Sequence, residues 1–192
     1  MIFISLTPFV PRRLFLLFAA ATCLFCVSCF AQPVFFAINS TPYDHQMIRV
    51  QAILQSTRTA HETEVSLRLV NHWVERLRAI PYGFSTQWKT PVEVESGATA
   101  DCKGKAVALY EKMRSAGAKN LRLVIGRRTP SSRSTHAWLE WSTPDGIYVL
   151  DPTINWAAYR IDEVGKDRYV PFYAYSGSHK FGAATATLLA KN

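Results

Sequence analysis

Three residues of the chain have the side chains of a nucleophilic catalytic set: Cys102, His136 and Asp151. A thiolate formed beside an imidazole attacks a carbonyl carbon, the imidazolium then protonates the leaving amine, and a carboxylate orients the imidazole. That chemistry is acyl transfer through a thioester. Each residue also has an ordinary structural interpretation, because cysteines pack in cores, strand histidines satisfy hydrogen bonds and aspartates before proline form turns. The predicted elements must therefore be able to bring the three side chains together.

The segment that follows Asp101 has the pattern of a helix with Cys102 in its first turn. Asp101 is a favourable N-cap residue and Gly117 a favourable C-terminal residue. The apolar stripe between them consists of Ala106, Val107, Leu109, Tyr110 and Met113. Unpaired backbone N–H groups and the positive end of the helix dipole favour an anion at this position. The sequence thus predicts a lowered pKa for the Cys102 thiol.

A predicted hairpin places the histidine beside the aspartate. Residues His136 to Trp141 alternate in polarity, Thr143-Pro144-Asp145-Gly146 fits a type I turn, and Ile147 to Asp151 forms the returning strand. If Thr143 and Gly146 flank the turn, Trp138 faces Asp151, and Asp151 is the diagonal neighbour of His136 on the same face. The two backbones are then about 7–8 Å apart, which the two side chains can bridge. A turn one residue longer or shorter would separate them.

The remaining elements are assigned from apolar spacing and from proline and glycine. One helix follows Pro42 and a second ends at Pro81, with apolar stripes of Met47, Val50, Ile53 and Leu54, and of Val65, Leu69, Trp73 and Leu77. Other assignments are a lead-in from Gln32 to Thr41, an irregular loop from Tyr82 to Thr99, a strand from Leu121 to Gly126, a polar loop from Arg127 to Thr135, and an edge strand from Tyr169 to Tyr175.

A tetrahedral intermediate requires an oxyanion hole. The backbone N–H of Cys102 can supply one donor. The second is expected from the preceding loop, where Gln87 and Trp88 both carry side-chain N–H groups. The sequence does not choose between them, and Trp88 also fits the core.

The N-terminal segment has the layout of an export signal. Arg12 and Arg13 precede an apolar run that extends to Phe30, and cleavage after Ala31 would leave a mature chain beginning at Gln32. A lipoprotein signal and an uncleaved membrane anchor are the alternatives. Cleavage would remove Cys23, Cys26 and Cys29, so that Cys102 is the one remaining thiol. The predicted organisation is a signal peptide at 1–31, one domain at 32–175 and a poorly ordered tail at 176–192, in a periplasmic or secreted protein.

Composition is that of an ordinary globular protein. The 192 residues are 48% hydrophobic and 19% charged, which excludes disordered, collagenous and coiled-coil classes. The net charge of +8 comes from scattered basic residues without a long run, so we expect no nucleic-acid partner. Arg127, Arg128 and Arg133 fit either an acidic partner or a solvated basic loop.

Several segments together resemble the transglutaminase-like superfamily, and in particular the bacterial transglutaminase-like cysteine proteinases. The resemblance covers about Asn71 to Asn155. Its segments are Asn71-His72-Trp73, Pro81-Tyr82, Trp88-Lys89-Thr90-Pro91-Val92-Glu93, Ala100-Asp101-Cys102-Lys103-Gly104-Lys105-Ala106, Arg114-Ser115-Ala116-Gly117, His136-Ala137-Trp138-Leu139-Glu140-Trp141 and Tyr148-Val149-Leu150-Asp151-Pro152-Thr153.

The resemblance implies an α+β, papain-like fold in which the nucleophile's helix packs on an antiparallel sheet. It also implies a catalytic triad of Cys102, His136 and Asp151, acting as a peptidase or amidase on a protein or peptide substrate, such as an envelope or surface protein. Amide transfer and an inactive binding module with the same fold are the alternatives. Adhesin-cutting members carry an acidic pair associated with calcium where this chain has Lys103 and Gly104. We therefore expect no cofactor, and no metal in the site.

Overall fold

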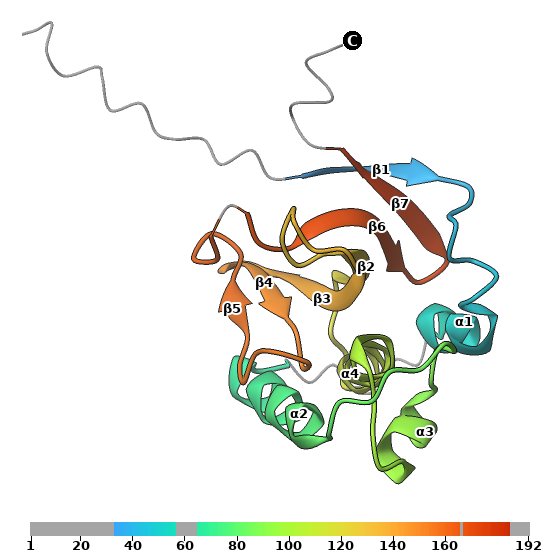
Figure 1. The fold of residues 1–192 in the computed structure, drawn as a ribbon. Helices are drawn as coiled ribbons and strands as arrows, with labels where there is room; N and C mark the ends of the chain where they lie inside the picture. The colour runs from blue at the N-terminus through green and yellow to red at the C-terminus, as the bar shows by residue number, and fades with distance from the viewer. Residues whose placement is uncertain (1–32, 57–64, 166, 185–192) are drawn as a thin grey trace, which may run out of the picture. The chain divides into compact units, whose positions relative to one another are not determined.

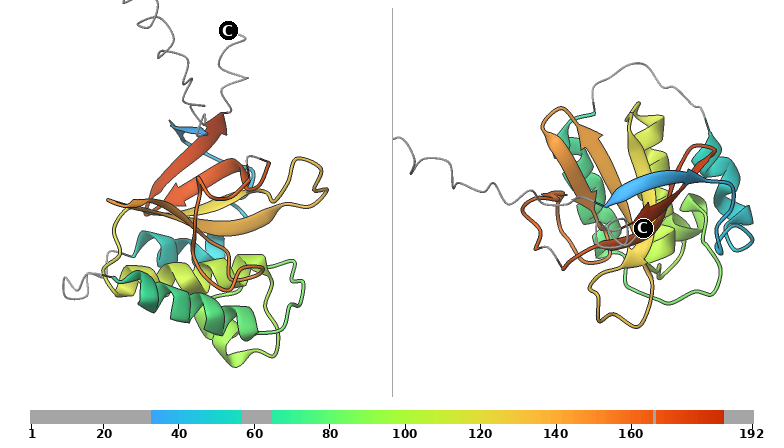
Figure 2. Two further views of the ribbon diagram at one scale, coloured as in Figure 1. Left: turned by 90° about the vertical axis from the view of Figure 1, so that its left-hand side faces the viewer. Right: turned by 90° about the horizontal axis from the view of Figure 1, so that it is seen from above.

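An antiparallel sheet and a layer of helices make up the domain. The computed structural model describes residues 33–56, 65–165 and 167–184. These residues form a seven-stranded sheet in the order β1-β7-β6-β2-β3-β4-β5. The strands are β1 (Val34–Ile38), β2 (Leu121–Arg127), β3 (His136–Thr143), β4 (Gly146–Leu150), β5 (Tyr159–Arg160), β6 (Val170–Ser176) and β7 (His179–Ala184). The helices are α1 (Ile48–Gln55), α2 (Leu67–Ala79), α3 (Pro91–Ser96) and α4 (Cys102–Ser115), and they lie on one face of the sheet (Figures 1 and 2). None of these helices is long and apolar enough to cross a membrane.

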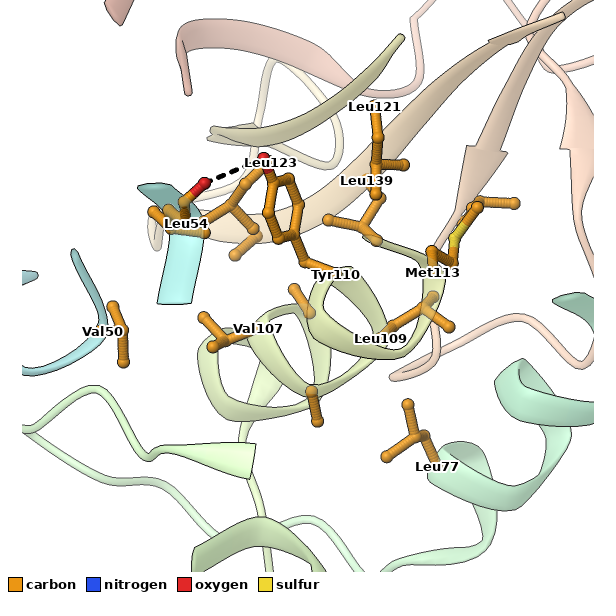
Figure 3. Packing of buried hydrophobic residues seen from close by; sticks show 14 of the residues in the cluster. Val50, Leu54, Leu77, Val107, Leu109, Tyr110, Met113, Leu121, Leu123 and Leu139 are labelled. Carbon is orange, nitrogen blue, oxygen red and sulfur yellow. Dashed lines mark hydrogen bonds between the residues drawn. The ribbon is translucent and has the colours of Figure 1, made fainter. Parts of the chain in front are cut away.

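Helix α4 is the centre of the core. Its N-cap is Asp101, whose Oδ1 accepts a hydrogen bond of 3.0 Å from the Gly104 N–H, and Gly117 just beyond its end has a φ of 95°. The helix buries side chains on nearly every side because it lies between the sheet and the other helices. Figure 3 shows this packing, in which α4 contributes Val107, Leu109, Tyr110 and Met113, and the sheet Leu121, Leu123 and Leu139. Burial of this apolar surface is the main force that fixes the helix on the sheet.

Strand β3 buries both of its faces. Ala137, Leu139 and Trp141 belong to the core that contains α4. Trp138 packs instead in a second apolar cluster, with Val124 from β2, Val149 from β4, Tyr169 and Ala174. The alternation predicted from the sequence is therefore confirmed, and the two clusters hold the strand from opposite sides.

The β3–β4 hairpin has the register that the sequence predicts. Thr143 pairs with Gly146 across the turn, and Leu139 pairs with Leu150 further along. Gly146 has a φ of 132°, in the region that glycine adopts without strain. The register brings the residue that follows β4, Asp151, back toward the start of β3.

Two helical assignments need correction. In α2 the buried residues are Val70, Val74 and Leu77, whereas Leu69 is 39% exposed, so the predicted stripe was displaced by one residue over part of the helix. The segment predicted as an irregular loop contains α3. That helix begins with a capping box in which the Thr90 hydroxyl accepts from the Glu93 N–H and the Glu93 carboxylate accepts from the Thr90 N–H.

The sheet also extends beyond its predicted limits. The expected lead-in contains β1, which pairs with β7 at one edge. Strand β6 was predicted at an edge but lies inside the sheet between β7 and β2. The prediction of a poorly ordered tail from residue 176 is wrong as far as residue 184, because β7 forms a hairpin with β6. Residues 185–192 and the predicted signal at 1–31 lie outside the described residues.

Candidate active site

Cys102 is the first residue of α4, as predicted. Its side chain is nearly buried at 7% exposure and forms no disulfide. The preceding Asp101 is completely buried. The Asp101 side chain caps the helix, which fixes the backbone on both sides of the thiol.

His136 and Asp151 meet across the β3–β4 hairpin. The His136 Nε2 and the Asp151 Oδ2 are 2.7 Å apart, in a pair whose aspartate is fully buried. The second carboxylate oxygen, Oδ1, accepts a 3.0 Å hydrogen bond from the Thr153 N–H. The structure thus confirms the contact between His136 and Asp151 that was predicted from the turn. The carboxylate is also held by a backbone N–H of the segment that follows it.

Cys102 interacts with the same imidazole. Burial lowers the pKa of His136, but the hydrogen bonds and charges of Asp151 and Cys102 outweigh it and raise that pKa to about 9. His136 is therefore protonated at neutral pH. Because Nε2 is hydrogen-bonded to Asp151, Nδ1 is the ring nitrogen left for another partner. The three residues singled out from the sequence therefore interact through one imidazole.

Tyr169 is a further member of this cluster that the sequence analysis missed. Its hydroxyl donates to the Asp151 Oδ2 over 3.0 Å and accepts from the Asn155 Nδ2 over 3.0 Å. Burial, followed by the charge of Asp151, raises the pKa of the Tyr169 hydroxyl, which keeps it a donor. The residue precedes β6, and no local pattern connects it with a carboxylate 18 positions earlier.

Tyr82 is a second residue that the sequence did not connect with the site. It forms a parallel bridge with Ala100, two residues before Cys102. Burial and then the charges of Cys102 and Asp101 raise the pKa of the Tyr82 hydroxyl. Tyr82 is nevertheless 58% exposed, so it borders the thiol on the solvent side.

The two oxyanion-hole candidates differ in their environments. Gln87 is exposed, and its Oε1 accepts a 3.1 Å hydrogen bond from Arg49 in α1. Trp88 is 1% exposed, and its Nε1 has no hydrogen-bond partner among the described residues. A buried N–H without a partner is costly and invites an acceptor from a ligand. The role of an oxyanion donor stays a prediction for both residues.

A lysine lies directly after the cysteine and contacts the N-cap. The Lys103 ammonium pairs with the Asp101 Oδ2 and donates to the Ser85 carbonyl oxygen over 2.9 Å. The same Oδ2 accepts a 3.3 Å hydrogen bond from the Ser85 N–H. Within the described ranges, no group of three or more His, Cys, Asp or Glu side chains is arranged to hold a metal ion.

Comparison with known proteins gives matches among solved structures. No family model and no curated protein sequence matches the chain. LapG from Legionella pneumophila in its EGTA-treated form matches with a TM-score of 0.53 and 14% identity, over 80% of this chain and 87% of LapG. The calcium-bound form of LapG matches with a TM-score of 0.52 and 16% identity, over 78% of this chain and 82% of LapG.

LapG is a transglutaminase-like cysteine protease, and at this level of identity the likeness concerns the fold. In this chain the fold is α+β, with Cys102 at the start of a helix that packs on an antiparallel sheet. The chain therefore has the papain-like, transglutaminase-like fold that its sequence predicted.

Proposed function

We propose that the protein is a cysteine hydrolase that cleaves peptide or other amide bonds. The observation that carries the proposal is the hydrogen bond of 2.7 Å between His136 and the buried Asp151 carboxylate, on an imidazole that also interacts with Cys102. Cys102 acts as nucleophile, His136 as general acid and base, and Asp151 as the group that orients the ring. The likeness of the fold to that of LapG supports the same assignment.

The reaction follows from the charges of this arrangement. The Cys102 thiolate attacks the carbonyl carbon, and the π electrons of the carbonyl move to its oxygen, which the Cys102 N–H and a second donor stabilise. When the intermediate collapses, the C–N bond breaks and the His136 imidazolium transfers its proton to the leaving amine. The neutral imidazole then takes a proton from water, whose oxygen attacks the thioester carbonyl carbon. When this second intermediate collapses, the C–S bond breaks, the acid leaves and the Cys102 thiolate forms again. Asp151 keeps its charge throughout.

The proposed function is tested on the purified mature protein with a panel of envelope and surface polypeptides. We expect new N-termini from the parent and none from Cys102→Ala, which removes the sulfur while the helix remains. Each cleaved bond should gain one water, as hydrolysis requires. Joining of a supplied amine to the acyl group would instead indicate amide transfer. Binding without a covalent product, equal in the parent and Cys102→Ala, would indicate an inactive module.

The residues around Cys102 do not fit a calcium ion. Calcium takes six to eight oxygen ligands, whereas Lys103 and Gly104 offer none from their side chains. The one nearby carboxylate, Asp101, already accepts from the Gly104 N–H, the Ser85 N–H and the Lys103 ammonium. We infer that the hydrolase needs neither calcium nor another cofactor.

We therefore expect hydrolysis to continue in the presence of excess EGTA, with a rate within about twofold of the untreated rate. The measurement is the initial rate on one cleaved polypeptide, with and without chelator. A large loss that calcium alone restores would contradict this inference and would locate the ligands elsewhere in the chain.

We propose a protein or peptide substrate of the cell envelope or surface. The apolar run after Arg12 and Arg13 supports export to the periplasm or beyond, and intact mass should then place the mature N-terminus near Gln32. A retained or lipidated segment would place the protein on a membrane. Arg127 ends β2, and Arg128 and Arg133 lie in the loop that leads into His136; none of the three is ion-paired within the described part of the chain. These basic side chains fit an acidic substrate segment.

A further inference from the structure

Lys103 holds two segments of chain together at the nucleophile. Its ammonium contacts the Asp101 carboxylate in the N-cap and the Ser85 carbonyl oxygen in the loop that follows α2, over 2.9 Å in the second case. It also lies 5.1 Å from the centre of the Phe84 ring. The lysine side chain is 19% exposed and the aspartate side chain fully buried. These contacts enclose the ammonium from three directions.

Further hydrogen bonds of Ser85 connect these contacts of Lys103 to the segment of the predicted oxyanion donors. The Ser85 N–H donates to the same Asp101 oxygen that pairs with Lys103. The Ser85 hydroxyl donates to the Gln87 carbonyl over 2.9 Å and accepts from the Gln87 N–H over 3.2 Å. The path from Ser85 to Trp88 is thus fixed to the residue that precedes Cys102.

The charge of Lys103 matters as much as its hydrogen bonds. A buried carboxylate is costly unless a counter-charge or donors compensate it. Asp101 also stands next to Cys102, where an uncompensated negative charge would oppose formation of a thiolate. A cation that binds Asp101 removes this penalty, and in the described structure that cation is the Lys103 ammonium.

We propose that Lys103 is a positioning residue, an internal cation that neutralises Asp101 and fixes the 82–88 loop against the start of α4. This role rests on the proposed function, because its purpose is to keep Cys102 ionisable and the loop in place beside it. The misfit of calcium at this position has the same cause: an ammonium group of the chain already occupies the oxygen atoms that a metal would need.

The test compares Lys103→Met with Lys103→Arg. We expect Lys103→Met to lower the rate of Cys102 alkylation at neutral pH by roughly tenfold or more, as loss of a neighbouring cation would. Lys103→Arg keeps the charge and should stay within about threefold of the parent. Lys89→Met is the matched control, because the Lys89 ammonium donates to the Thr99 carbonyl and not to Asp101. The control should react like the parent.

A double-mutant cycle distinguishes the loss of the interaction between Lys103 and Asp101 from a general loss of stability. Asparagine is as good an N-cap residue as aspartate, so Asp101→Asn keeps the helix and removes the charge. If Lys103 acts through that charge, Lys103→Met should cost much less in the Asp101→Asn background than in the parent. An equal loss in both backgrounds would overturn the proposal.

Hydrogen exchange provides a readout that does not depend on catalysis. In Lys103→Met the amides of residues 82–88 should exchange faster, whereas those of the β3–β4 hairpin should not change. Unchanged exchange together with a parent-like alkylation rate would overturn the proposal. If instead the thiol of the parent protein reacts independently of His136, the proposed function fails. The exchange result still decides whether Lys103 fixes residues 82–88 against the start of α4.

Discussion

Replacement of Asp151 by asparagine is expected to lower the pKa of His136 from about 9 by more than about one unit. The carboxylate raises this pKa both by its hydrogen bond to Nε2 and by its charge, while burial of the ring lowers it. Asparagine removes the charge, so the lowering of the His136 pKa by burial is no longer offset by the carboxylate. The imidazolium that protonates the leaving amine is then less populated above neutral pH, and the carboxylate no longer holds the ring in the catalytic orientation. Hydrolysis should fall by a factor on the order of 10²–10⁴.

The measurement is an NMR titration of the His136 ring, combined with the pH dependence of kcat/KM. In the parent the rate should decline as pH rises through about 9, where His136 loses its proton. In Asp151→Asn that decline should occur at lower pH. Glu140→Gln is the control, because Glu140 lies on the same strand, is buried and pairs with Arg122 at 3.3 Å. An unchanged His136 titration in Asp151→Asn would show that Asp151 does not orient the ring.

Much of the site was predictable because its geometry depends on local structure. A two-residue turn between Thr143 and Gly146 fixes the register of the hairpin, and the register places His136 and Asp151 together. The N-cap at Asp101 and the apolar stripe after it place Cys102 in the first turn of α4. The remaining step, the docking of α4 onto the sheet near His136, came from the family resemblance rather than from spacing.

The parts that were missed depend on contacts between distant segments. Strand β1 pairs with β7 although about 145 positions separate them, and neither segment carries a strong pattern of its own. Tyr169 likewise reaches Asp151 from a segment 18 positions away. The interior position of β6 comes from its short hairpin with β7, in which Ser176 pairs with His179, and the composition of that segment did not indicate a strand. By contrast, α3 did carry a local signal, the Thr90 to Glu93 capping box, which Pro91 obscured because proline at the first helical position resembles a loop.

The apolar stripe of α2 shows a different limit of prediction from the sequence. Leu69 and Val70 both begin series of apolar residues at helical spacing, and the helix can bury only one of the two. The choice depends on how α2 is rotated against α4, which sequence spacing does not specify. In the structure Val70 and Val74 are fully buried.

The second large effect is expected at Cys102 itself. A cationic imidazole beside a thiol stabilises the thiolate, which is the form that alkylating agents attack. An ordinary thiol with a pKa of about 8.5 is less than about 1% ionised at pH 6. His136→Ala removes the imidazole, and the alkylation rate at pH 6 should therefore fall by about tenfold to a few hundredfold.

The most direct test of the account is therefore the rate of Cys102 alkylation at pH 6 in the parent and in His136→Ala, with circular dichroism to show that both are folded. His179→Ala is the matched control, because His179 is exposed at the start of β7. The account predicts a reactive thiol in the parent and in His179→Ala, and a slow thiol in His136→Ala. Equal rates in all three proteins would show that Cys102 is an ordinary cysteine, and would contradict the assignment of a cysteine hydrolase.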